Sequence, residues 1–258
     1  MQPDKNLIRI PEELLWDYRE TPDDKNMRKH GRREVDVIEN NPILTEQQKI
    51  FLKRFAAWPS GSVFYLTGGT ALSAFYLRHR LSEDLDFFTE GDVDTELILT
   101  FLRSLPEVEE LESERKLDRK IFLISYSGGE QLTTGFTKYP FKAIDPFTEV
   151  DGIHADSLAD ILVNKLMAMT DRKDIKDYVD IYFILKEFPE LSLDEMIGKT
   201  ELKFGSKGLK DILQGRFLEC PANIEALTMK KTCNAKELVA FFKETARGLI
   251  KRSNAEEE

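Results

Sequence analysis

Two aspartates, Asp84 and Asp86, lie two residues apart in the short aromatic segment DLDFF. This segment has the alternation of a β-strand, on which residues two apart point to the same face. Two adjacent carboxylates repel each other unless a cation neutralises them. The natural partner is a hard divalent ion with oxygen ligands, Mg²⁺ above all, with Mn²⁺ as the substitute. The alternative is a solvated strand edge that carries two ordinary surface acids.

Two glycines, Gly68 and Gly69, lie between a strand expected over 62–67 and a helix expected over 70–77. Because they lack side chains, a ligand can approach the backbone closely there. The free amides at the beginning of the helix favour an anion such as phosphate, and Thr70 is placed to add a hydroxyl contact. The alternative is that the glycines only make the turn.

A phosphate-binding turn followed by a pair of metal-binding acids is what phosphoryl or nucleotidyl transfer requires. The metal neutralises phosphate oxygens, while the turn fixes the leaving group. The segment is not a Walker A loop, because no Gly-Lys-Ser/Thr sequence ends it. It is not a protein-kinase loop either, since the glycine spacing differs and no His-Arg-Asp segment is present.

A lysine interrupts the apolar stripe of a helix predicted over 157–170, whose Ser157 and Asp160 have capping-box spacing. Lys165 falls near the middle of that stripe. Its ammonium must therefore either extend to solvent or meet an anion inside the fold. A nucleoside triphosphate is one anion that would fit the phosphate-binding turn.

The next helix, expected over about 175–186, places Asp177 and Asp180 on one face. Lys173 and Lys176 share that polar side. On these residues alone, the face is predicted to be solvated and salt-bridged.

The elements that must position these residues come in a mixed order, followed by helices. A helix is expected over 45–58 with Thr45 as its N-cap, and another over 97–105. Two β-rich stretches follow, KIFLISYSGG and QLTTGFTKYPFKAI, with Gly128-Gly129 as a hairpin turn between them. Beyond residue 156 the pattern is mostly helical, so the order predicts an α+β fold.

The 258 residues carry a formal net charge of −10, which argues against broad electrostatic contact with nucleic acid. A local basic groove stays possible, and its candidate residues are Lys116, Arg119, Lys120, Lys138 and Lys142. Scattered surface lysines are the commoner explanation for such a set.

Two cysteines do not make a disulfide framework, and with three histidines they do not predict a Cys/His zinc site. The N-terminus lacks the apolar core of a signal peptide. No apolar run approaches the roughly 20 residues that span a bilayer. We therefore expect a soluble cytoplasmic protein with no membrane partner.

The segments GGTAL and HRLSEDLDFF resemble the first motif of the AbiEii/AbiGii-type nucleotidyltransferases, the toxins of bacterial toxin–antitoxin and abortive-infection systems. MenT-like toxins are relatives. Lys165, Arg172 and the segment KDYVDIY are similar to the downstream motifs of that family. The resemblance covers about 64–185 and implies a polymerase-β-like nucleotidyltransferase core with a mixed sheet, followed by a helical C-terminal part.

The resemblance also implies roles for individual residues. Asp84 and Asp86 would ligate Mg²⁺, and Lys165 would touch the triphosphate of a bound NTP. Asp177 and Asp180 would complete the catalytic site. The nucleotide phosphates would be held by Gly68, Gly69 and Thr70, with Arg80 and Ser82 as additional phosphate or hydroxyl contacts.

The sequence departs from the family at two places. Many relatives have lysine immediately before the two glycines, where this chain has Thr67, so one cationic phosphate contact is expected to be missing. A third metal-binding carboxylate has only one candidate, Asp151, on an expected short strand or in a loop. Without a third acid, Asp177 is the candidate general base.

The resulting prediction divides the chain into an extension over 1–44, a nucleotidyltransferase core over 45–155 and a helical part over 156–258. The predicted activity is Mg²⁺-dependent transfer of NMP from an NTP to a hydroxyl of a tRNA 3′ end or a protein. A type IV-like toxin of this kind implies a cognate antitoxin partner. The alternatives are a small-molecule (aminoglycoside-like) nucleotidyltransferase and an inactive binding module of the same fold.

Overall fold

The computed structural model describes residues 37–256, with side chains through residue 249. In this part of the chain seven strands form one mixed sheet, in the order β3-β4-β5-β2-β1-β7-β6. β1 is parallel to β7 and β2 is parallel to β5, whereas the other neighbours are antiparallel. The strands are β1 (Tyr65–Thr67), β2 (Leu85–Thr89), β3 (Val108–Lys116), β4 (Arg119–Tyr126), β5 (Gln131–Lys138), β6 (Thr148–Val150) and β7 (Ile153–Ala155).

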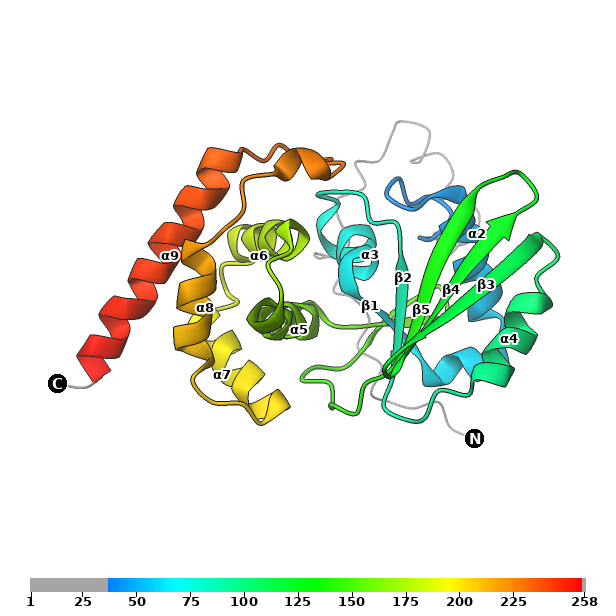
Figure 1. The fold of residues 1–258 in the computed structure, drawn as a ribbon, viewed down its shortest axis with the longest axis horizontal. Helices are drawn as coiled ribbons and strands as arrows, with labels where there is room; N and C mark the ends of the chain where they lie inside the picture. The colour runs from blue at the N-terminus through cyan, green and yellow to red at the C-terminus, as the bar shows by residue number, and fades with distance from the viewer. Residues whose placement is uncertain (1–36, 257–258) are drawn as a thin grey trace, which may run out of the picture.

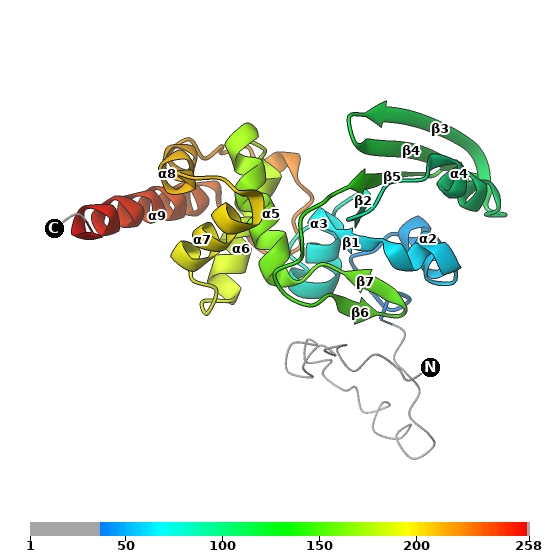
Figure 2. The same ribbon diagram turned by 90° about the horizontal axis from the view of Figure 1, so that it is seen from below.

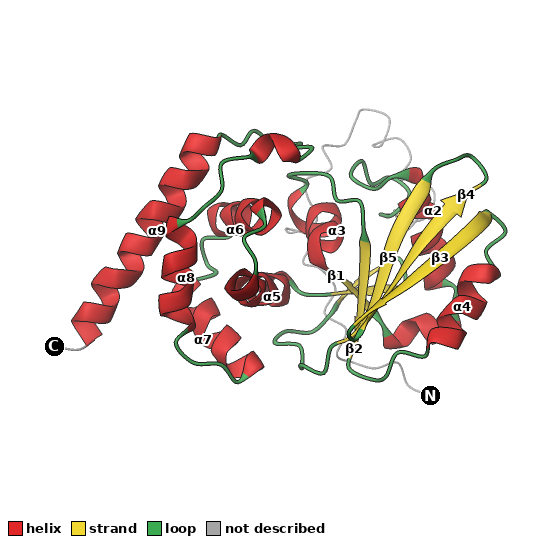
Figure 3. Cartoon of the chain, viewed as in Figure 1, coloured by secondary structure: helices red, strands yellow, loops and turns green. Residues whose placement is uncertain are grey.

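Helices pack against this sheet and then continue alone to the end of the described chain (Figure 1, Figure 3). They are α2 (Glu46–Ala56), α3 (Gly68–Leu72), α4 (Thr95–Arg103), α5 (Leu158–Asp171), α6 (Ile175–Glu187), α7 (Leu193–Phe204), α8 (Leu209–Leu218) and α9 (Ala235–Glu256), with short 3-10 turns at Pro59–Val63 and Ile224–Ala226. This arrangement confirms the predicted α+β class. Among the described residues, no helix is both long enough and apolar enough to cross a bilayer.

The helix α3 lies between the sheet and the pair α5 and α6, while α8 and α9 lie farther out (Figure 1, Figure 2). A π-helical turn, Ser73–Leu77, continues α3 and ends at Arg78 in the left-handed region with φ 51°. The chain then doubles back, and Leu81 N–H donates to the carbonyl of Thr228 at 2.9 Å. The segment before α9 therefore holds the loop that leads into β2.

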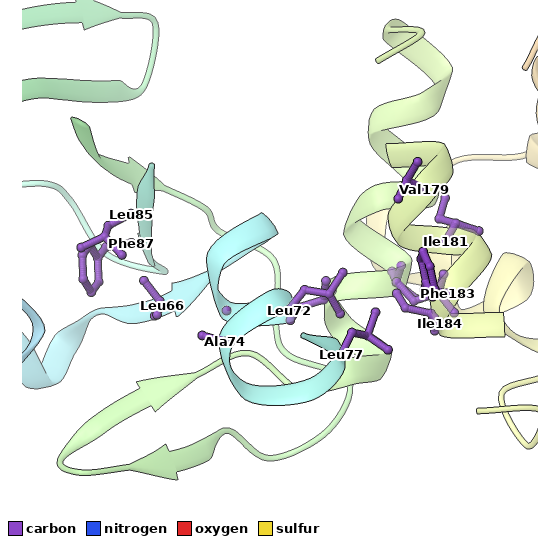
Figure 4. Packing of buried hydrophobic residues seen from close by; sticks show 14 of the residues in the cluster. Leu66, Leu72, Ala74, Leu77, Leu85, Phe87, Val179, Ile181, Phe183 and Ile184 are labelled. Atoms are coloured by element: carbon purple, nitrogen blue, oxygen red, sulfur yellow. The ribbon is translucent and has the colours of Figure 1, made fainter. Parts of the chain in front are cut away.

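Alternate side chains of the strand β2 point to the core and to the candidate site. Leu85 and Phe87 are fully buried, whereas Asp86 and Phe88 on the opposite face are half-buried. Phe87 stacks on Phe55 of α2 with ring centroids 4.2 Å apart. Figure 4 shows Leu85 and Phe87 close to Leu66 of β1 in this part of the core.

The predicted cap of α2 is confirmed and has a second role. Thr45 Oγ1 accepts from the backbone N–H of Gln48, and Gln48 Oε1 accepts from that of Thr45, which completes a capping box. The amide of Gln48 also donates to the carbonyls of Ser82 and Glu83, at 2.8 and 3.1 Å. The helix start thus fixes the segment that precedes Asp84.

Of the other predicted elements, some are confirmed and some differ in the structure. The Gly128-Gly129 turn joins β4 to β5 as expected, and the helix expected over 97–105 is α4. The strand expected over 62–67 begins only at Tyr65, because residues up to Val63 form a 3-10 turn. The edge strand β3 was not predicted, since its exposed, charged sequence lacks the apolar alternation of a half-buried strand.

The predicted boundary between the nucleotidyltransferase core and the helical part, at residues 155 and 156, stays a prediction. All seven strands lie between residues 65 and 155, and the helices from α5 onward begin at residue 158. The extension expected over 1–44 lies mostly outside the described residues, which begin at residue 37.

We expect Phe87→Ala to lower the free energy of unfolding by about 3–5 kcal/mol, because it leaves a cavity beside Phe55 and Phe136. Urea unfolding followed by circular dichroism measures this loss. Leu117→Ala is the control, since that side chain is 86% exposed and should change little. Equal effects of the two substitutions would contradict this assignment of the core.

Candidate active site

The glycine turn and the second aspartate lie against each other. Thr67 pairs with Asp86 across β1 and β2, and Gly68 then turns the chain into α3 with φ +73°. A Cβ atom on Gly68 would lie 3.1 Å from Asp86 Oδ2. Glycine therefore serves both the backbone conformation and the close approach of the carboxylate.

Gly69 makes room for two more predicted residues. A Cβ at this position would lie 2.6 Å from Arg80 Nη2 and 2.8 Å from Ser82 Oγ. A larger residue would displace the guanidinium and the hydroxyl from the start of α3. Gly68, Gly69, Arg80, Ser82 and Asp86 are thus brought together in one place.

The Thr70 hydroxyl has a different partner from the one expected. It is buried and donates to the backbone carbonyl of Asp84, with a longer contact of 3.4 Å to that of Ser82. The hydroxyl therefore stabilises the segment before β2. The predicted contact between Thr70 and a phosphate stays a prediction.

The electrostatic environment of Asp86 is mixed. Burial raises the pKa of its carboxyl above the usual range, the Arg119 guanidinium opposes that shift, and the Asp84 carboxylate adds to it. Arg119 Nη2 lies 2.6 Å from Asp86 Oδ1. Lys165 and Arg172 are also close enough to lower the pKa of Asp86.

Asp180 is the centre of a buried ionic network. Arg80 donates through Nε and Nη2 to its two oxygens, at 2.7 and 2.8 Å. Lys165 Nζ approaches Oδ2 at 2.5 Å, and His79 Nε2 lies 2.6 Å from Oδ1. Burial favours the protonated acid, but the charges of Lys165 and Arg80 outweigh it and hold the pKa of Asp180 well below its usual range.

Burial lowers the pKa of the His79 imidazole, which is consequently neutral at pH 7. Because the carboxylate of Asp180 can only accept, His79 donates through Nε2–H. His79 lies outside the set of predicted site residues. The signal that includes it is its place as the first residue of the segment HRLSEDLDFF, which resembles the family motif.

Asp177 belongs to the same network. Arg172 donates to its two oxygens at 2.7 and 3.1 Å, and Lys165 Nζ lies 3.1 Å from Oδ1. Burial acts against ionisation, yet the charges of Lys165 and Arg172 give a lowered pKa. A carboxylate with a lowered pKa and two cationic partners is a poor proton acceptor, so the general-base role expected for Asp177 has no support here.

The solvated face predicted for α6 is wrong. Asp177 and Asp180 are about 1% and 0% exposed, and their partners come from other elements. Lys173 instead pairs with Glu219 at the surface. Lys165, in the apolar stripe of α5, does not extend to solvent. Its ammonium meets anions inside the fold, which was the other alternative, and these anions are Asp177 and Asp180.

The candidate for a third metal-binding acid is also wrong. Asp151 lies in the turn between β6 and β7 with φ 47°, and its Oδ2 accepts from the N–H of Ile38 at 2.7 Å. Because β7 is parallel to β1, the beginning of β7 lies at the sheet edge opposite the one where β1 ends at Thr67. Asp151 therefore lies away from Asp86.

Two carboxylates, those of Asp84 and Asp86, are the candidate ligands for a divalent ion at this site. Across residues 37–249 no group of three or more histidine, cysteine or acidic side chains converges as a ready-made metal site. The pair Asp84 and Asp86 nevertheless fits Mg²⁺, which keeps several waters and commonly binds through one or two carboxylates together with substrate phosphates. Burial is the main cause of the raised pKa of Asp86 and the Asp84 carboxylate adds to it, so a bound cation would lower that pKa.

Thr67, which replaces the lysine of many relatives, is buried and points to an acid. Its Oγ1 donates to Asp156 Oδ2 at 2.6 Å, and Asn164 Nδ2 donates to the same oxygen at 3.0 Å. Burial raises the pKa of Asp156 to about 7, while the Thr67 hydrogen bond opposes the shift. The residue before the glycines is therefore part of a buried hydrogen-bond network.

Comparison with known proteins identifies the family. The family model described as "Nucleotidyl transferase AbiEii toxin, Type IV TA system" matches residues 50–251, more than half of the chain. The protein belongs to the AbiEii nucleotidyltransferase family. Membership supports nucleotidyl transfer as its enzymatic activity and confirms the resemblance found in the motifs.

Relatives of this AbiEii-family protein include the uncharacterized protein aq_aa25 of Aquifex aeolicus. It is 30% identical over 148 residues, which are 56% of this chain and 68% of the relative. Two solved structures from Helicobacter pylori are similar over 83% of this chain and 100% of theirs. They are JHP933, with 22% identity and a TM-score of 0.53, and a candidate nucleotidyltransferase, with 20% identity and a TM-score of 0.55. These likenesses show a nucleotidyltransferase fold.

We expect Asp180→Asn to lower the free energy of unfolding of this AbiEii-family protein by about 3–5 kcal/mol, because it leaves Arg80 and Lys165 buried without full compensation. Urea unfolding at pH 7 measures the loss. The matched control is Glu219→Gln, which breaks an exposed pair with Lys173 and should change stability little. An Asp180→Asn protein as stable as the control would show that the network contributes nothing.

Asp156 gives stability a specific dependence on pH. Its folded pKa of about 7 exceeds the ordinary value of 3.8, so its contribution is complete below about pH 4 and is lost as pH rises through 7. Asp156→Asn removes this loss, because an amide does not ionise. Relative to the parent, the variant should gain about 2–3 kcal/mol between pH 5 and pH 8 in urea unfolding. A stability difference that does not change with pH would contradict the buried, protonated state.

Proposed function

We propose that this protein is a Mg²⁺-dependent nucleotidyltransferase that moves NMP from an NTP to an acceptor hydroxyl and releases pyrophosphate. The observation that carries the proposal is the contact between the Gly68 turn and Asp86, with Arg80, Lys165 and Arg172 close by. A phosphate-binding turn, a metal-binding carboxylate and several cations then border the same space. Family membership supports the same activity.

The residues present divide into groups with different tasks. The backbone at Gly68 and Gly69 would bind the nucleotide phosphates, and the half-buried Ser82 hydroxyl would contact a phosphate or the acceptor. Asp84 and Asp86 would hold Mg²⁺. When bound, that ion neutralises phosphate oxygens and orients them for in-line attack.

The cations act from the side of the helices. Lys165 lies against the acids of α6 and near Asp86, so its ammonium would attract the triphosphate while remaining held in place. Arg80 donates to Asp180 through Nε and Nη2 and to the carbonyl of Leu81 through Nη1. Its role would be to position the turn, since Nη2 lies close to Gly69. Asp177 and Asp180 likewise act by positioning Lys165 and Arg80.

The acceptor we propose is a hydroxyl of a macromolecule, either the 3′ end of tRNA or a protein side chain. The basic groove considered for RNA is only partly free, because Arg119 pairs with Asp86 and Lys138 pairs with Asp92 at 2.6 Å. The family description as a type IV toxin–antitoxin component supports a bacterial toxin controlled by a cognate antitoxin. We propose that antitoxin as its protein partner.

Incubation with each of the four labelled triphosphates, Mg²⁺, total RNA and cell protein tests the activity. We expect label transfer that requires Mg²⁺ and falls by about 100-fold or more in Asp84→Ala and Asp86→Ala, the scale on which loss of one transition-state contact acts. Asp92→Ala is the control, because that exposed acid pairs only with Lys138 among the contacts described and should leave transfer unchanged.

The location of the label decides between the alternatives. Label on RNA or on protein identifies the macromolecular acceptor, whereas label only on a small molecule favours an aminoglycoside-like nucleotidyltransferase. Absence of transfer together with absence of Mg²⁺-dependent NTP binding in calorimetry would replace the enzyme by an inactive binding module. Transfer that is equal in Asp84→Ala and in the parent would refute the assigned site.

A further inference from the structure

A glycine in the middle of β5 borders the candidate metal site. Gly135 pairs with Asp86 across the parallel strands β5 and β2, so the two positions share one face of the sheet. A Cβ on Gly135 would lie 2.7 Å from Arg119 Nε, 2.9 Å from Arg119 Nη2 and 3.1 Å from Asp86 Oδ1. The nearest atoms are therefore side-chain atoms of the two charged residues, and the missing Cβ makes room for their contact.

Arg119 reaches Asp86 by crossing a whole strand. It begins β4 and pairs there with Thr137, and β5 separates β4 from β2. Its guanidinium passes over Gly135, and Nη2 donates to Asp86 Oδ1 at 2.6 Å. The two side chains are 38% and 28% exposed, so the pair lies at the solvent-accessible border of the site.

The guanidinium keeps unused hydrogen-bonding capacity. Arg119 Nε is buried and has no hydrogen-bond partner among the described residues, although a buried donor is normally satisfied. The planar guanidinium of an arginine can donate two parallel hydrogen bonds, so an arginine with an unsatisfied donor next to a metal-binding carboxylate suits bidentate contact with an anion such as phosphate. The present pairing with Asp86 uses only part of what this side chain offers.

We infer that Arg119 is a further substrate-binding residue of the nucleotidyl transfer reaction, with two alternating partners. In the nucleotide-free protein it neutralises Asp86 in the space that a divalent ion needs. When the metal and the triphosphate bind, it leaves Asp86 and donates to a phosphate oxygen. A guanidinium and a divalent ion at one carboxylate oxygen repel each other, so the two positions exclude one another. This inference rests on the proposed function.

The inference predicts opposite changes in two affinities of Arg119→Gln. Without nucleotide, Mn²⁺ should bind about tenfold more tightly, because its competitor is gone. Binding of a non-hydrolysable Mg²⁺–NTP analogue should weaken by about tenfold, because a phosphate contact is lost. Mn²⁺ titration followed by electron paramagnetic resonance gives the first affinity, and calorimetry gives the second.

Two further variants make the test specific. Lys120→Gln is the matched control, since the next residue of a strand points to the opposite face, and both affinities should stay unchanged. Arg119→Lys keeps the charge and should keep the weaker Mn²⁺ binding of the parent.

Failure of the inference and failure of the proposed function are distinguishable. If the parent binds Mn²⁺ through Asp86, as shown by its loss in Asp86→Asn, but Arg119→Gln binds Mn²⁺ equally or more weakly, Arg119 is not a competitor and the inference is overturned. If Arg119→Gln gains Mn²⁺ affinity without losing nucleotide affinity, the phosphate contact is overturned. If the parent binds no Mn²⁺ that depends on Asp86, the proposed metal site itself fails.

Discussion

The buried carboxylate of Asp180 is the constraint on which the site depends. Removing an anion from water costs several kcal/mol, and the cost is offset only when cations and donors surround it. Its partners, His79, Arg80 and Lys165, come from the loop before β2 and from α5, while Asp180 itself lies on α6. These elements must therefore come together for the anion to be stable, and the arrangement fixes the guanidinium that borders Gly69.

The charge balance at the site differs from the net charge of the whole chain. The whole sequence carries a net charge of −10, yet four acids and four cations meet around the glycine turn. They are Asp84, Asp86, Asp177, Asp180, Arg80, Arg119, Lys165 and Arg172. The acidic composition therefore gives no argument against binding a nucleotide here, because field strength at a site follows local charges.

The sequence predicts those features that are set by local patterns and misses those set by distant partners. The cap of α2, the alternation of β2 and the glycine turn each follow from a few adjacent residues. The burial of Asp177 and Asp180 does not, because one helix face cannot show that Lys165 and Arg80 will reach it. For Asp151 the sequence leaves a short strand and a loop as alternatives, because its aspartate-glycine sequence also suits a tight turn, and the structure has it in the turn between β6 and β7. Gly135 is a missed signal, since a glycine inside a strand often marks close approach of another group.

The same reasoning extends to all three glycines at the site. Gly68 admits Asp86, Gly69 admits Arg80 and Ser82, and Gly135 admits Arg119. Only Gly68 has a backbone conformation that itself favours glycine, so at Gly69 and Gly135 the reason for glycine lies in the neighbouring side chain. Charged side chains reach the centre of this site through space that no Cβ occupies. The positions without side chains thus determine where the charges lie, and the charges in turn determine which ligand the site can hold.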